Sequence, residues 1–240
     1  MIELHTWPTP NGQKVSIMLE ECGLPYEVVA VDINRGEQFA PEFLAISPNH
    51  RIPAIVDRDP ADGGAPLPVF ETGAILVYLA EKTGRFLPGP DDIRGRKATM
   101  EWLMWQMGGL GPMAGQARHF RQAMGGVEVP YGIERYSKEV RRLYGVMDRR
   151  LQDHAFLGGA DYSIADIACW PWARPSQRQG VDKAEFPGVK RWFDAISARP
   201  AVQAGMVLLA DRRGSKAMSK ESRDILFGAR QFDRDWTKRT

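Results

Sequence analysis

One segment, residues 49–72, constrains the fold more than any other part of this chain. It contains two short apolar runs, residues 54–56 and 69–70, which predict a pair of strands on either side of a glycine- and proline-rich bend. Pro53 stands just before the first run, and an X-Pro bond is cis at modest cost. A cis turn there would leave the backbone N–H and C=O of Ile52 at a surface, where an extended peptide can pair with them.

The same segment ends where the second strand gives way to a helix. Thr72 is a favourable N-cap for a helix over residues 72–82. A helix N-terminus attracts a carboxylate through its free amides and its dipole. A peptide-like anion with a free backbone and a carboxylate would therefore suit both features. The alternative is that the proline and the N-cap mark nothing more than two turns.

The composition excludes several classes of function. With 240 residues, 43% hydrophobic residues and a net charge of +2, the chain can form a packed core and has no general attraction to nucleic acid or to an acidic membrane. No segment is apolar over the roughly 20 residues that a membrane span needs, and residues 1–5 lack a signal-peptide pattern. Cys22 and Cys169 form no C-x-x-C pair and, with four histidines, supply no metal framework. We expect a metal-free protein of the reducing cytoplasm.

The order of predicted elements indicates two domains. The N-terminal part alternates strands and helices in the order β-α-β-α-β-β-α, beginning with a strand over residues 2–6 and a helix over residues 13–22. The second strand, residues 26–31, should run parallel to the first because a helix connects them. A linker rich in glycine and proline follows this part of the chain.

The region after the linker predicts helices and no convincing strand. These helices cover residues 95–121, 130–152, 163–177 and 187–198. Ser163 and Asp166 form a capping box at the start of the third, which we interpret as a fold element and not a site. The fold class is therefore α/β followed by all-α. The predicted divisions are residues 1–83, a linker over 84–93, a helical domain over 94–209, and a tail of uncertain order over 210–240.

Four motifs, taken at this order and spacing, resemble those of glutathione transferases over residues 1–209. They are Ile52-Pro53-Ala54-Ile55, Phe70-Glu71-Thr72-Gly73-Ala74-Ile75-Leu76 with Tyr78-Leu79, the proline-rich linker, and Tyr162-Ser163-Ile164-Ala165-Asp166. Other motifs resemble the bacterial Nu class, among them Pro8-Thr9-Pro10-Asn11-Gly12 and Ile167-Ala168-Cys169-Trp170-Pro171-Trp172. The resemblance implies a thioredoxin-like domain followed by an all-helical domain, in a chain that forms a homodimer.

The resemblance also implies how glutathione would bind. The backbone of Ile52 would pair with the cysteinyl unit across cis-Pro53. Glu71 would hold the γ-glutamyl ammonium, and the amide and hydroxyl of Thr72 would hold the γ-glutamyl carboxylate. Gln38 would reach the glycyl end.

Four further residues take implied roles from the same resemblance. Thr9 and Asn11 would face the sulfur and carry the catalysis, and Asn11 would also count among the glutathione-binding residues. Arg51 is a further glutathione-binding residue, and Arg135 matches a position that helps to bind a second glutathione.

These residue types fit thiol chemistry. A thiol of pKa about 8.5 is mostly protonated at neutral pH, and only the thiolate is a good nucleophile. Lowering that pKa by about two units takes roughly 2.7 kcal/mol, which hydrogen bonds from Thr9 and Asn11 together with a helix N-terminus can supply. The loop after the first strand contains no Tyr, Ser or Cys, which argues against a mixed disulfide with a protein thiol.

The leading hypothesis is a glutathione-dependent disulfide-bond reductase of the Nu class type. It would use the thiolate of bound glutathione and no protein cysteine, and it would also reduce organic hydroperoxides. A first alternative is a transferase that conjugates glutathione to hydrophobic electrophiles, because the same residues serve both reactions. A second is a non-catalytic glutathione-binding or regulatory module. That module would be indicated by loss of Thr9, Asn11, Glu71 or Thr72, all of which are present.

Overall fold

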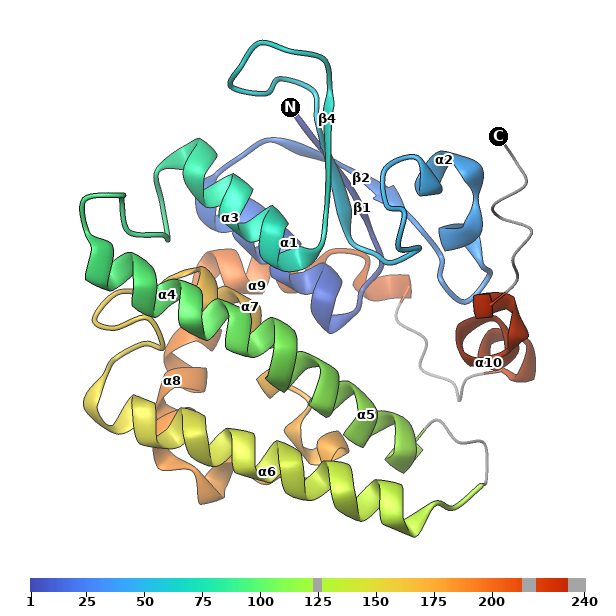
Figure 1. The fold of residues 1–240 in the computed structure, drawn as a ribbon, viewed down its shortest axis with the longest axis vertical. Helices are drawn as coiled ribbons and strands as arrows, with labels where there is room; N and C mark the ends of the chain where they lie inside the picture. The colour runs from blue at the N-terminus through green and yellow to red at the C-terminus, as the bar shows by residue number, and fades with distance from the viewer. Residues whose placement is uncertain (123–126, 213–218, 233–240) are drawn as a thin grey trace.

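The computed structural model describes residues 1–122, 127–212 and 219–232, and it places a small α/β domain against a bundle of helices (Figure 1). The sheet of the first domain has the strand order β2-β1-β3-β4. Strand β1 pairs with β2 in parallel and with β3 in antiparallel, and β3 pairs with β4 in antiparallel. The bounds of the strands are Ile2–Thr6, Tyr26–Ala30, Ala54–Asp57 and Leu67–Phe70 for β1 to β4. This is the predicted thioredoxin-like arrangement.

Helices of the first domain follow the predicted order. Helix α1 (Pro10–Cys22) connects the parallel strands β1 and β2, and α3 (Thr72–Thr83) follows β4 directly. A 3-10 turn over Glu37–Phe39 and the short helix α2 (Pro41–Leu44) form the helical segment that the predicted order places between β2 and β3. Gly23, at a φ of 66°, ends α1 in the left-handed conformation that glycine adopts most readily.

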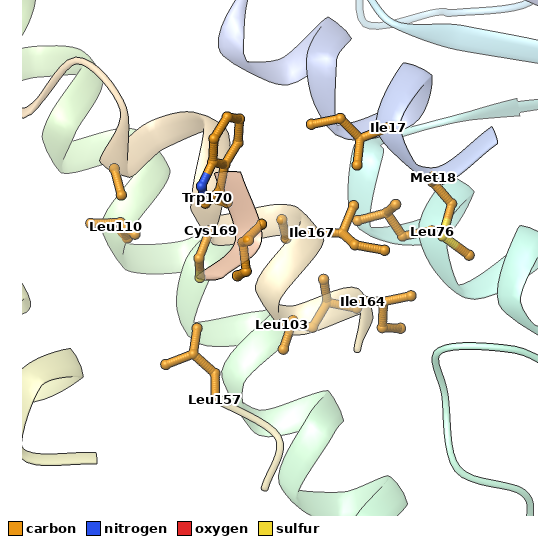
Figure 2. Close-up of a cluster of buried hydrophobic side chains, with 14 of the residues drawn as sticks. Ile17, Met18, Leu76, Leu103, Leu110, Leu157, Ile164, Ile167, Cys169 and Trp170 are labelled. Carbon is orange, nitrogen blue, oxygen red and sulfur yellow. The ribbon is translucent and has the colours of Figure 1, made fainter. Parts of the chain in front are cut away.

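Helix α1 lies between the sheet and the helical domain, and it packs against α3, α7 and α9. Figure 2 shows Ile17 and Met18 of α1 in one apolar cluster with Leu76 of α3 and Ile167 of α7. On the α9 side, a Cβ on Gly205 would clash with the backbone of Ile17. Both domains therefore share one core, and α1 is buried on most of its surface.

The helical domain begins at α4 and follows the predicted pattern with three differences, the first of which is an additional helix over Pro200–Val207. Its helices are α4 (Ile93–Trp105), α5 (Gly111–Gln122), α6 (Pro130–Asp153), α7 (Ile164–Ala173), α8 (Pro187–Ser197) and α9 (Pro200–Val207). The expected single helix over residues 95–121 is instead interrupted by a π-helical turn over Gln106–Leu110. The helix expected to reach residue 177 ends at Ala173, because Pro175 cannot continue it, and 3-10 turns follow over Ser176–Gln179 and Lys183–Glu185.

The capping box predicted at the start of α7 is present. The buried carboxylate of Asp166 accepts hydrogen bonds from the backbone N–H of Ser163 at 3.0 Å and of Leu157 at 2.9 Å, and from the indole of Trp192 at 2.8 Å. These bonds satisfy the carboxylate within the core. Asp166 is therefore a fold element.

The first helix of the helical domain, α4, starts after a segment without regular structure. Because α3 ends at Thr83 and α4 starts at Ile93, we propose that the domain boundary lies in residues 84–93. Within the tail, residues 213–218 and 233–240 lie outside the described part, while α10 (Lys220–Phe227) and short 3-10 turns over Ala210–Arg212 and Ala229–Phe232 are described. Across the described part of the chain, no helix has both the length and the apolar character for a membrane span.

Candidate active site

The loop between β1 and α1 places Thr9 at the N-terminus of α1. Thr9 is the N-cap, with φ −106° and ψ 165°, and its Oγ1 accepts a hydrogen bond from the backbone N–H of Gly12 at 3.2 Å. A Cβ at Gly12 would clash with the carbonyl oxygen of Trp7, so the tight turn requires glycine here. Since the Thr9 oxygen is used as an acceptor, its O–H remains available as a donor.

Asn11 is oriented by the other domain. The indole Nε1 of Trp172, at the C-terminal end of α7, donates to Oδ1 of Asn11 at 2.9 Å. This bond uses the acceptor end of the amide and leaves the NH2 group of Asn11 as a donor. The N-terminus of α1 therefore presents two neutral hydrogen-bond donors, from the N-cap Thr9 and from Asn11 in the first turn.

The Ile52–Pro53 peptide bond is cis, as the sequence predicts. The ladder between β3 and β4 starts at the pair Ala54 and Phe70, so the backbone N–H and C=O of Ile52 lie beyond the sheet pairing. The Ile52 side chain packs against the small cluster formed by Val31 and Phe43.

Glu71 and Thr72 form the junction between β4 and α3. Glu71 has φ 69° and ψ 119°, a conformation that L residues seldom adopt and that is concentrated at functional sites. Its exposed carboxylate accepts a hydrogen bond from Nδ2 of Asn49 at 3.3 Å. Thr72 is the first residue of α3 and Glu71 takes the N-cap position, so the N-cap predicted at Thr72 is wrong by one residue. The backbone amides of this first turn have no partner within the helix. This junction can therefore bind an ammonium at Glu71 and a carboxylate at Thr72.

A buried lysine stands directly behind Thr72. The Nζ of Lys14 donates to Oγ1 of Thr72 at 3.3 Å and to Oε1 of Gln106 at 2.7 Å, and it lies 4.0 Å from the sulfur of Met107. Only 2% of Lys14 is exposed, and burial lowers its pKa to about 7. We call the hydrogen-bonded side chains of Thr72, Lys14 and Gln106 the buried polar network.

The π-helical turn over Gln106–Leu110 places Gln106 in the buried polar network. Such single turns widen a helix locally and occur frequently at functional sites. Gln106 is fully buried at the start of the turn, and its Nε2 has no hydrogen-bond partner among the described residues. The helical domain thus contributes a buried amide to a site that is otherwise built by the first domain.

Three predicted residues do not join this constellation directly. Gln38 is buried, and its Oε1 lacks a partner within the described part of the chain. Arg51 donates from Nη1 to Oε1 of Gln231 at 2.9 Å, so the described tail occupies its guanidinium. Arg135 is exposed on α6, which packs mainly against α5 and α8 and not against the elements that hold the other predicted residues.

Neither cysteine lies in the loop that holds Thr9. Cys22 is at the other end of α1, a distance of about 20 Å for a helix of this length. Burial raises its pKa, and its sulfur lies 3.5 Å from the hydroxyl of Thr83. Cys169 is fully buried in the core that Figure 2 shows, which raises its pKa well above the usual value. In residues 1–122, 127–212 and 219–232, no group of three or more His, Cys, Asp or Glu could hold a metal ion.

Three groups of the site were not predicted from the sequence. They are the side chains of Lys14 and Gln106 and the indole N–H of Trp172. A signal for Lys14 is present, because Ile17 and Met18 follow it at i+3 and i+4 and place the lysine on an apolar helix face. Gln106 depends on the π-helical turn, which no residue pattern indicates. Trp172 is only partly buried and reaches across to Asn11, a contact between the two domains that the motif containing it does not indicate.

Known proteins agree with this architecture. The family model for the glutathione S-transferase N-terminal domain matches residues 9–82, and that for the C-terminal domain matches residues 133–200. The disulfide-bond oxidoreductase YfcG of Escherichia coli strain K12 is 54% identical over 216 residues, which are 90% of this chain and 98% of that protein.

Solved structures give the same result. A glutathione transferase family member from Pseudomonas fluorescens, with two glutathione bound, is 46% identical, with a TM-score of 0.80 over 85% of this chain and 92% of that one. A glutathione transferase from Pseudomonas putida, with one glutathione disulfide bound per subunit, is 45% identical, with a TM-score of 0.80 over 85% of this chain and 90% of that one. The chain therefore belongs to the glutathione S-transferase family.

Proposed function

We propose that this protein is a glutathione-dependent disulfide-bond reductase of the Nu class type. The observation that carries the proposal is the pair of donors at the N-terminus of α1, one on the N-cap Thr9 and one on Asn11 in the first turn. Thr9 and Asn11 each have their acceptor oxygen occupied, by the N–H of Gly12 and by the indole of Trp172, so that each offers a hydrogen to an anion. That anion is the thiolate of bound glutathione.

The surrounding groups match the rest of glutathione. The backbone of Ile52 would pair with the cysteinyl unit, Glu71 would bind the γ-glutamyl ammonium, and the N-terminus of α3 at Thr72 would bind the carboxylate. The structure with two glutathione and the one with glutathione disulfide support a site with room for both molecules.

The proposal also assigns glutathione-binding roles to one glutamine and two arginines. Gln38 would bind the glycyl end of the first glutathione, and Arg135 would approach the second. Arg51 would bind glutathione after exchanging its present partner, Gln231 of the tail.

The reaction is an exchange between sulfur atoms. The bound thiol releases its proton to solvent, and the thiolate attacks a disulfide RS–SR′, which forms the mixed disulfide GS–SR and releases R′S⁻. The thiolate of a second glutathione attacks the glutathione sulfur of GS–SR, forms GS–SG and releases RS⁻. Both released thiolates take up protons. The net change is two glutathiones oxidised and one disulfide reduced, with no protein sulfur involved.

The test compares the wild type with a Cys22→Ala/Cys169→Ala variant in glutathione-dependent reduction of a small model disulfide. We expect the variant to keep most of the turnover, because Cys22 lies at the far end of α1 and Cys169 is fully buried with a raised pKa. A folded variant without activity would assign the reaction to a protein cysteine. A wild type that binds glutathione but reduces no disulfide would refute the reductase function.

The same thiolate supports two further reactions. Reduction of an organic hydroperoxide would give an alcohol, water and glutathione disulfide from two glutathiones. Conjugation would add glutathione to a hydrophobic electrophile. Rates with a hydroperoxide and with a model electrophile, measured beside the disulfide, rank the three activities, and we expect the disulfide to be the best substrate.

We also propose a homodimer in a reducing compartment. Large apolar side chains are exposed in both domains, at Leu67 and Phe70 of β4 and at Ile93 and Met104 of α4. Exposed apolar surface is covered in many proteins by a partner subunit. Light scattering at micromolar concentration should give twice the mass of one chain, and the mass of a single chain would contradict the dimer.

A further inference from the structure

Lys14 is a buried cation without an anionic partner. No carboxylate lies within ion-pair distance of its Nζ among the described residues, and its contacts are the neutral atoms of Thr72, Gln106 and Met107. An uncompensated buried charge destabilises a folded protein strongly. A lysine in this position therefore suggests that an anion arrives from outside the chain.

We propose that Lys14 is a positioning residue that supplies, through Thr72, the counter-charge for the γ-glutamyl carboxylate of bound glutathione. This inference rests on the proposed function, because it takes glutathione as the ligand at the N-terminus of α3. Lys14 does not need to contact the ligand. It acts on the hydroxyl that does.

The hydrogen bonds explain how the effect reaches the ligand. Because Lys14 donates to Oγ1 of Thr72, the hydroxyl hydrogen of Thr72 must point elsewhere. It points to the sulfur of Met107 at 3.4 Å, and a thioether is a weak acceptor. A carboxylate at the N-terminus of α3 is a better acceptor, so the hydroxyl would turn to it. The ammonium then stabilises the carboxylate across one intervening oxygen atom.

Few other charges surround Lys14. Its titratable neighbours are Glu71, before α3, and Cys169, on α7, whose thiol is kept protonated by burial. The other acid of α7, Asp166, is bound by Leu157, Ser163 and Trp192. Helix α9 carries no titratable side chain between Pro200 and Val207.

The remaining neighbour of α1 is β1, whose charged groups are paired away from Lys14. Glu3 binds Arg58, and His5 lies against Phe43. The acids of α1 itself, Glu20 and Glu21, sit in its last turn and bind Tyr26 and Arg199. Among the described groups that pack against α1, Lys14 is thus the one whose charge changes close to neutral pH.

Proton uptake follows from this arrangement. Burial holds the pKa of free Lys14 at about 7, and a bound carboxylate would raise it. Below pH 6 the lysine is already charged, so binding takes up almost no proton. At pH 8 it is mostly neutral, and binding should take up close to one proton per site. The ligand should consequently bind about tenfold more weakly at pH 8 than at pH 6.

The experiment is calorimetric titration with S-methylglutathione, a ligand without a thiol proton, in two buffers of different ionisation enthalpy. The wild type should take up close to one proton at pH 8 and almost none at pH 6. Binding without proton uptake at pH 8 would overturn the role of Lys14 and leave the glutathione site intact. Absence of binding would instead overturn the proposed function.

A matched ligand identifies the group that Lys14 serves. The S-methyl form of 4-aminobutanoyl-Cys-Gly keeps the ammonium and lacks only the γ-glutamyl carboxylate. It should bind more weakly and without proton uptake at pH 8. Equal proton uptake with this ligand would assign the proton to another group and overturn the inference.

Two variants remove the proton uptake by different means. Lys14→Met removes the titrating group. Gln106→Glu replaces the neutral amide that Lys14 contacts with a carboxylate, so that Lys14 stays protonated in the free protein. Both should bind S-methylglutathione with an affinity that no longer changes between pH 6 and pH 8. Lys190→Met, at an exposed lysine paired with Asp194, should keep the wild-type proton uptake. Uptake that persists in Lys14→Met would contradict the inference, and the wild-type titration decides it even if a variant fails to fold.

Discussion

The two sides of this site differ in the kind of group that each offers to a ligand. On the sulfur side, Thr9 and Asn11 are neutral donors at the N-terminus of α1, each held by one hydrogen bond to its acceptor oxygen. On the carboxylate side, Thr72 is backed by Lys14, a cation buried among neutral groups. The difference teaches what each part of the ligand needs.

The sulfur has to change partner during the reaction, whereas the carboxylate only has to stay bound. A thiolate held by a full positive charge would lose nucleophilicity as its pKa fell. Neutral donors stabilise it by a smaller amount and leave it reactive. A carboxylate benefits from a fixed charge, and a buried one is screened little by salt.

The largest effect is expected from Glu71, the proposed partner of the ligand ammonium on the carboxylate side. Glu71→Ala should weaken glutathione binding by about 10- to 100-fold, the typical range for a hydrogen bond to a charged group. Glu81→Ala is a matched control, because Glu81 is on α3, the helix that Glu71 precedes, and is paired with Arg96 instead. Calorimetry measures both. Unchanged affinity in Glu71→Ala would remove Glu71 from the site.

Lys14 should also shape the stability of the ligand-free protein. Between pH 7 and pH 10 the unfolded chain carries a proton on Lys14 that the folded protein lacks, because burial lowers the folded pKa to about 7. The unfolded state therefore binds more protons, and this contribution makes stability rise with pH over that range. From pH 6 to pH 9 the rise due to Lys14 should be about 2–3 kcal/mol.

Lys14→Met should abolish that rise and make the free protein more stable at pH 6. Denaturant unfolding of wild type and variant at both pH values, without glutathione, measures the difference. Groups other than Lys14 titrate equally in both proteins, so the difference between them isolates the lysine. A variant that is less stable than the wild type at pH 6 would mean that the contacts of Lys14 stabilise the fold by more than burial of its charge destabilises it.

The smallest effect is expected from Trp172, which orients Asn11 on the sulfur side. Trp172→Phe keeps a ring in the same place and removes the N–H donor. Turnover should fall about threefold to tenfold with little change in glutathione affinity, as expected for one hydrogen bond of about 1 kcal/mol. Trp170→Phe is the matched control, because its indole donates to the backbone of Phe193 and not to the site. Equal losses in both variants would deny Trp172 a specific role.

The sequence predicts the local backbone of the site better than the contacts that cross it. Turn residues and an X-Pro bond are local signals, so the loop at Thr9, the cis turn at Pro53 and the start of α3 at Thr72 follow from neighbouring residues, with the N-cap of α3 at Glu71 and not at Thr72. The capping box at Ser163 is local in the same sense. Each of these predictions depends on contacts within a few positions of the chain.

The parts that were missed depend on contacts between distant segments. Lys14 reaches Thr72 and Gln106 across 58 and 92 positions, and Trp172 reaches Asn11 across 161. Patterns of local periodicity contain no information on such pairs. The π-helical turn is a similar case, because the sequence predicts a helix on both sides of it and nothing marks the widened turn.

The central claim is that hydrogen bonds from Thr9 and Asn11, and no protein base or cysteine, ionise bound glutathione. The most direct measurement is the ultraviolet absorbance of the thiolate in the glutathione complex, titrated with pH. In the wild type the thiol should titrate about two pH units below free glutathione, and most of that difference should vanish in a Thr9→Val/Asn11→Ala variant that still binds the ligand. A bound thiol that titrates like free glutathione, or a lowered pKa that survives in the variant, would contradict the claim.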